Sequence, residues 1–169
     1  MRMRMRMWKI VGLLAVAGLL ALPTSGDAMP GKKEKLKAKI NGKAFKANLP
    51  QSIVGTHDGL TNLVILNGTF HKGVTKVTVK NLTVSCVAPL DGATFPMTVT
   101  ECTGNFSIST ASIGGSSLVA WAGSGLSMTI TSFDGTRLNG TFEGTLPAND
   151  VAQQPANVVK GKFAVDMLQ

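Results

Sequence analysis

Charged residues are scarce in this chain, and the motifs that identify common enzymes are missing. Asp, Glu, Lys and Arg make up 15% of the 169 residues, too few for a disordered polyelectrolyte. The sequence has no G-x-S-x-G elbow, no P-loop, no H-E-x-x-H motif and no C-x-x-C pair, which argues against the hydrolases, nucleotide-binding enzymes and thiol oxidoreductases that carry them. No segment after residue 28 has a helical apolar period, so a helical domain is not expected.

Histidines and carboxylates are also few, and they are dispersed along the chain. His57 and His71 are the only histidines, and with Asp58 they could bind a divalent metal if their loops met. The simpler interpretation is two exposed loop histidines. Glu143 is expected to face solvent, which leaves no acid pair of the kind that glycosidases need. We therefore expect no enzyme activity, no metal and no cofactor, and keep a metal-dependent hydrolase using His57, Asp58 and His71 as the alternative.

Only two cysteines are present, Cys86 and Cys102. In an oxidising compartment a disulfide between them is the default expectation, and it should add roughly 3 kcal/mol of stability by the chain-entropy model. The alternative, a metal site, would need two further soft ligands that are not nearby in the sequence.

Residues 1–28 have the three parts of a secretory signal peptide: a basic start, an apolar run over Ile10–Leu22 and a short segment rich in small residues. A membrane anchor is the alternative, but a span needs about 20 apolar residues. We therefore expect export to the periplasm or the outside of a bacterium, with residues 30–169 as the mature domain. Removing four of the 17 basic residues and one of the nine acidic ones leaves 13 and eight, a formal charge of +5.

The segment 126–146, LSMTITSFDGTRLNGTFEGTL, alternates apolar and polar residues on both sides of Asp134-Gly135. This pattern is typical of a β-hairpin with one buried face. A three-residue loop, 133–135, would bring Ile130 opposite Leu138 and keep both apolar sets on one face. An even-length turn through Lys72-Gly73 is likewise expected to pair Leu66 with Val79.

A second hairpin is predicted at Asn41-Gly42, with Ala38 opposite Phe45. Its outward residues are lysines, namely Lys35, Lys37, Lys39 and Lys46. They could bind an anionic polysaccharide, an envelope surface or lipid headgroups, or they could simply protect a sheet edge from aggregation. Nucleic acid is not an expected partner, because the chain is predicted to be exported and its aromatic residues lie on the buried face.

The triplet Gly-x-Phe occurs four times, at 68–70, 104–106, 140–142 and 161–163. Each places a bare glycine beside a ring on one face, so that a neighbouring ring can cover the glycine and the sheet can curl. We expect a single all-β antiparallel meander of nine or ten strands closing into a barrel-like, calycin-like domain, with a two-sheet β-sandwich as the alternative. The residues expected to fill its interior or line a small apolar pocket there are Phe45, Phe70, Trp121, Met128, Phe142 and Phe163.

The pieces AKINGKAF (38–45), LNGTF (138–142) and GKF (161–163) resemble a family of uncharacterised secreted bacterial proteins, many of them lipoproteins. Members open with an Ile-Asp/Asn-Gly-Lys-x-Trp/Phe hairpin and close with Gly-Thr-Phe and Gly-Lys-Phe strands. This chain lacks the lipoprotein cysteine and has Phe45 where Trp is usual. The resemblance implies no activity. The expected function is a non-enzymatic binding or structural module whose ligand and oligomeric state the sequence does not specify.

Overall fold

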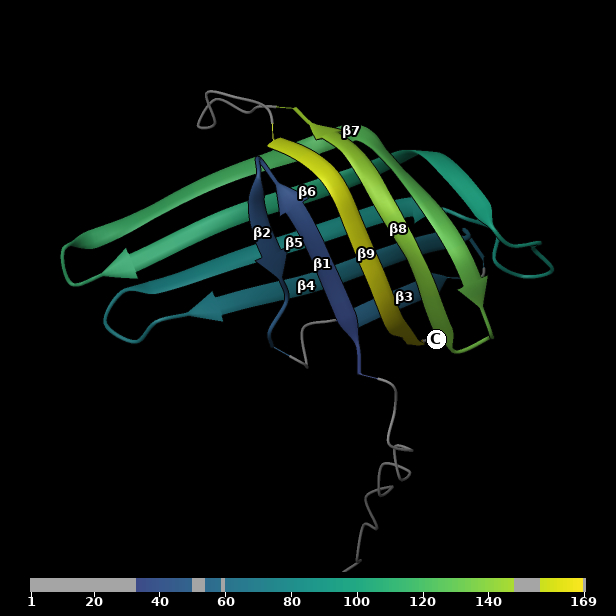
Figure 1. Cartoon of the computed structure of the whole chain (residues 1–169), viewed down its shortest axis with the longest axis horizontal. Coiled ribbons are helices and arrows are strands. Elements are labelled where there is room, and N and C mark those ends of the chain that lie inside the picture. Colours follow the sequence, from purple (N-terminus) through teal and green to yellow (C-terminus); the bar gives the residue numbers. More distant parts are fainter. Residues whose placement is uncertain (1–32, 50–53, 59, 148–155, 169) are drawn as a thin grey trace, which may run out of the picture. The chain divides into compact units, whose positions relative to one another are not determined.

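The computed structural model describes residues 33–49, 54–58, 60–147 and 156–168 (Figure 1). The described secondary structure consists of nine strands: β1 (Lys35–Ile40), β2 (Lys43–Lys46), β3 (Val54–Asp58), β4 (Leu63–Lys72), β5 (Val77–Val87), β6 (Met97–Ser112), β7 (Gly115–Phe133), β8 (Arg137–Leu146) and β9 (Ala156–Leu168). The predicted signal peptide lies outside the described residues. A search of the described part finds no helix suited to crossing a membrane.

Strands β3 to β9 form a closed seven-strand barrel. Each pairs antiparallel with the next along the chain, and β9 closes the ring by pairing with β3. The closing pair is parallel, with Gly55 opposite Met167. This follows from the odd strand number, because the first and seventh strands of an up-and-down meander run in the same direction. The expected all-β barrel-like fold is confirmed, and the nine described strands agree with the expected nine or ten. Only seven of them close the ring, and one pair in the otherwise antiparallel sheet is parallel.

The β1–β2 hairpin lies outside the ring, on the edge of β9 that β3 leaves uncovered. β1 pairs antiparallel with β9 from Lys35 opposite Ala164 to Ile40 opposite Val158. After β2, the backbone N–H of Asn48 donates to the Thr69 carbonyl of β4 (3.0 Å). The predicted turn is confirmed: Ala38 pairs with Phe45, and Asn41 and Gly42 both have positive φ, as a tight two-residue hairpin requires.

Two Gly-x-Phe triplets pack against each other across β8 and β9. Gly140 lies opposite Phe163, and Phe142 lies opposite Gly161. The two rings are stacked with centroids 6.4 Å apart, and each covers the glycine across from it, leaving no room there for a Cβ. The expectation of rings over glycines is confirmed at these two triplets, and both rings belong to the buried core.

The β7–β8 hairpin keeps the expected face but not the expected register. Met128, Ile130, Leu138 and Phe142 are all buried, yet Ile130 pairs with Gly140 and not with Leu138. The predicted three-residue loop is therefore wrong. Asp134 and Arg137 close a tighter turn, and a bulge between Ile130 and Ser132 restores the matching of apolar faces.

The Asp134 turn makes an acid-sensitive contribution to stability. Its carboxylate accepts hydrogen bonds from the N–H of Arg137 (2.6 Å) and from the N–H (3.0 Å) and hydroxyl (2.9 Å) of Thr136. These bonds lower the pKa of Asp134 below its ordinary value of 3.8. A carboxyl whose pKa is lowered on folding stabilises the fold above the ordinary value and loses that contribution as the pH falls through the lowered one.

We expect Asp134→Asn to make the unfolding free energy less dependent on pH below 3.8, because the variant has no carboxylate to protonate there. Urea unfolding at a series of acidic pH values measures this slope. Asp91→Asn removes the same charge from another loop and serves as control. Equal slopes for wild type and Asp134→Asn would contradict the assignment.

The β4–β5 register also differs from expectation. Leu66 pairs with Val84 and not with Val79, so the predicted turn is wrong. Leu82 and Val84 are buried, whereas Val77 and Val79 are only half-buried and, by alternation, lie on the other face. The cause is that residues 77–80 of β5 are all only half-buried, so the valine alternation in this part of the strand does not mark a face of the core.

Two long hairpins project together from the barrel. Figure 1 shows β4–β5 and β6–β7 extending to the same side, past the β1–β2 turn, and Val77 of β5 pairs with Ala111 of β6. β6 and β7 are long strands of 16 and 19 residues. Val74 and Ile113, at the two hairpin ends, are almost fully exposed. We call the four-stranded part that includes the Val77–Ala111 pair and ends at Val74 and Ile113 the projection.

The predicted disulfide is confirmed. Cys86 on β5 and Cys102 on β6 are joined, with Cα atoms 4.4 Å apart and a separation of 16 positions in the sequence. Both cysteines are buried in the barrel core. The bond therefore ties two neighbouring strands across the loop 88–96.

Candidate functional site

The four lysines expected to face outward do so. Lys35, Lys37 and Lys39 are exposed on β1 between buried residues, and Lys46 is exposed on β2. The structure adds Lys162 opposite Lys37 and Lys160 opposite Lys39, both on β9. Residues directly opposite each other on neighbouring strands share a face. We call the resulting surface the lysine face; it consists of Lys35, Lys37, Lys39, Lys46, Lys160 and Lys162.

The lysine face brings like charges together. Lys37 has Lys46 across from it on one side and Lys162 on the other. The Cβ atoms of such pairs are about 5 Å apart, and directly opposite like charges destabilise a sheet. Along one strand, successive outward residues are spaced by about 6.7 Å. The result is a regular grid of ammonium groups whose repulsion an anionic partner would relieve.

Protection of a sheet edge accounts for only part of this arrangement. The strand order is β2-β1-β9, so β2 is the edge strand and its lysines fit that role. β1 has a hydrogen-bonded neighbour on each side, and β9 pairs with β1 and β8. Five of the six lysines therefore lie on strands whose edges are already covered.

The carboxylates at one end of the lysine face are already engaged. Asp166 forms an ion pair with Arg137 (2.5 Å), whose side chain is largely buried. The pKa of Glu34 is raised, first by burial and second by the negative charge of Asp166. The charge of Asp166 is therefore already offset by Arg137 and provides little neutralisation for the lysines.

Two shallow depressions flank the lysine face. One, with a volume of about 280 Å³, is lined by residues that include Lys35, Lys37 and Lys46. The other, of about 330 Å³, is lined by hydroxyl groups beside charged groups; its residues are Ser127, Thr129, Thr141, Phe142, Glu143, Lys160 and Lys162. A hydroxyl-lined surface next to ammonium groups can hydrogen-bond a polar anion as well as attract it.

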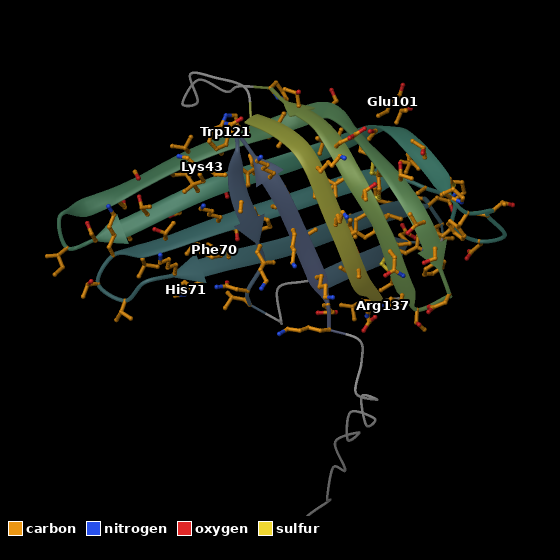
Figure 2. All side chains as sticks on the ribbon, viewed as in Figure 1. Lys43, Phe70, His71, Glu101, Trp121 and Arg137 are labelled. Atoms are coloured by element: carbon orange, nitrogen blue, oxygen red, sulfur yellow. A yellow bond between two sulfur atoms is a disulfide. The ribbon has the colours of Figure 1, made fainter. Side chains whose placement is uncertain are left out.

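The residues expected to fill or line the barrel interior divide into two groups. Met128, Phe142, Phe163 and Phe45 are buried in the core, so they act as packing. Phe70 and Trp121 are only partly buried, and they lie apart from one another in the view of Figure 2. Phe106, which was not singled out from the sequence, stacks on Trp121 with centroids 5.6 Å apart.

The alternative metal site is not assembled. His57 pairs with Val64 on β4, and His71 lies seven residues further along that strand, which is about 23 Å and on the opposite face. A shared metal with bonds of about 2 Å cannot join them. His57 packs edge-on to Phe133. The Asp58 carboxylate accepts hydrogen bonds from the Leu60 N–H and the Thr61 hydroxyl, which lower its pKa. The described residues contain no group of three His, Cys, Asp or Glu able to hold a metal ion.

Comparison with known proteins gives no match: no protein-family model, no curated protein and no solved structure is similar to this chain. The resemblance to secreted bacterial proteins therefore stays a prediction from the sequence, and the lysine face is interpreted from its own geometry.

Proposed function

We propose that the protein is an exported, non-enzymatic binding module that docks its lysine face onto an anionic polysaccharide of the bacterial envelope. One observation carries the proposal: lysines from both ends of the chain converge on three neighbouring strands and lie directly opposite one another. Such crowding costs stability unless an anion offsets it.

The geometry favours a polymer over a single small anion. The lysines spread over three strands at spacings of about 5–7 Å, so one compact ligand cannot contact them all. The hydroxyl-lined depression beside Lys160 and Lys162 suits a partner that carries hydroxyl groups as well as charges. A uronate or phosphate-bearing glycan has both.

Export supports the same proposal. A buried disulfide fits an oxidising compartment, and the expected signal peptide would deliver the domain to the envelope, where anionic polysaccharides are found. A structural role at the envelope is compatible with this docking.

We expect Lys37→Gln/Lys162→Gln to weaken binding to alginate, a polymer of uronate sugars, by about ten- to thirtyfold. The estimate takes about 1 kcal/mol per lysine near an anionic surface. Biolayer interferometry on immobilised alginate, with neutral dextran for comparison, measures the affinity. Binding by the wild type should fall steeply as salt rises, because screening shortens from about 10 Å at 0.1 M to about 3 Å at 1 M.

The matched control is Lys72→Gln/Lys76→Gln, which removes the same charge from the end of the projection. It should retain nearly all of the affinity. Equal losses in both double variants would mean that net charge alone drives binding and would overturn the proposal. Binding to phosphatidylglycerol vesicles in preference to alginate would identify lipid headgroups as the partner instead.

A further inference from the structure

A small recess lies where the β1–β2 turn meets the projection. Its volume is about 100 Å³, and Lys43, Phe45, Lys80, Phe106, Ile108 and Trp121 are among its lining residues. We call it the ring notch. Figure 2 shows Lys43 and Trp121 close together at this turn.

The floor of the ring notch is aromatic and ordered. Phe45 meets Phe106 edge-on, with centroids 6.1 Å apart and an interplanar angle of 87°. Phe106 in turn stacks on Trp121 at 21°. Phe45 and Phe106 are buried, whereas Trp121 is partly exposed. Two rings are thus fixed by the core, and they hold the third ring at the opening.

The opening carries positive charge. Lys43 is exposed on the same face of β2 as the buried Phe45, two residues away. Lys80 pairs with Ile108 across β5 and β6, and its ammonium lies 5.4 Å from the centre of the Phe70 ring. No carboxylate lines the notch. An apolar floor bordered by two lysine side chains is complementary to a flat apolar ring that bears an acidic group.

We infer that the ring notch binds a small aromatic carboxylate, its ring on Trp121 and Ile108 and its carboxylate between Lys43 and Lys80. The notch is smaller than the cavity of about 150 Å³ that encloses benzene, so a ring would be held against Trp121 by one face and would keep part of its surface in solvent. A sugar acid fits less well, because the lining offers few partners for its hydroxyl groups and unpaired hydroxyls cost affinity. This inference is independent of polysaccharide docking, because the lysine face lies on the other side of β1 and β2.

The test is titration of the full chain with phenylacetate. In a Trp8→Phe background Trp121 is the only tryptophan, so a change in its fluorescence reports occupation of the notch. We expect a dissociation constant on the order of 0.1–1 mM, typical of a ligand of this size. Phenylacetamide, the uncharged counterpart, should bind at least tenfold more weakly.

Single variants separate this site from general charge effects. Lys43→Gln and Lys80→Gln should each weaken phenylacetate binding about tenfold, while Lys76→Gln and the lysine-face variant Lys37→Gln/Lys162→Gln should not change it. All these positions are exposed or partly exposed, so the variants should fold, and circular dichroism checks this. Equal binding of the amide, unchanged binding in both notch variants, or tighter binding of galacturonate than of phenylacetate would overturn the inference.

Discussion

Replacing Phe142 with alanine is expected to lower the unfolding free energy by about 3–5 kcal/mol. The ring is 1% exposed, stacks on Phe163 and covers the backbone of Gly161. Alanine would leave a cavity at the β8–β9 seam that neighbouring side chains can fill only in part. Because domains are typically stable by about 5–15 kcal/mol, this loss should be obvious in urea unfolding.

Gly161→Ala tests the same contact from the other strand. A Cβ at this position would overlap the Phe142 ring, and overpacking of this kind typically costs 1–3 kcal/mol. In a Phe142→Ala background the overlap is gone, so the added methyl group should cost almost nothing there. The two substitutions should therefore be strongly non-additive, which is the signature of direct contact.

Gly114→Ala is the matched control for this cycle, because nothing lies within 4 Å of a Cβ at that position. It should be nearly neutral. Additive costs for Phe142→Ala and Gly161→Ala would contradict the reciprocal packing of rings over glycines.

The second large effect concerns the disulfide. Cys86→Ala/Cys102→Ala should lower the unfolding free energy by roughly 3 kcal/mol, because the link joins residues that are 16 positions apart in the sequence and restricts the unfolded chain. Urea unfolding of the double variant, and of the wild type with and without reductant, measures the loss. The double alanine variant avoids the free thiol that a single substitution would leave.

The wild type in reductant is the internal comparison for this experiment. It should lose about as much stability as the double variant and should regain it on reoxidation. Unfolding that is indifferent to reductant would contradict the bond, and a loss only in the double variant would assign the effect to packing of the two buried residues.

Local sequence patterns predicted local structure well. The Asn41-Gly42 turn fixed the register of β1 and β2 because its geometry depends on two residues. The register of β7 and β8 was missed because the bulge beside Thr131 has no signal in the alternation, although the buried face was predicted correctly. In β5 the alternation of Val77 and Val79 misled, because those residues lie in the projection, where no core selects a face.

The candidate sites were harder to predict because they depend on contacts between distant segments. Lys160 and Lys162 are far from the β1 lysines in the sequence, and only the pairing of β9 with β1 places them beside Lys39 and Lys37. The ring notch was missed for the same reason, because its residues come from the β1–β2 hairpin and from β5, β6 and β7. A sequence gives which residues alternate, and only the strand order shows which of them meet.

The closing of the barrel by the parallel β3–β9 pair has a consequence for folding during synthesis. Synthesis delivers β9 after β1 to β8, and β9 alone pairs with β8, β1 and β3. Until its 13 residues arrive, the nascent sheet has open margins that can pair with other chains. Folding should therefore require β9 as a whole. A chain truncated before Gly161 should be recovered as aggregate, although its sequence still contains all of β1 to β8.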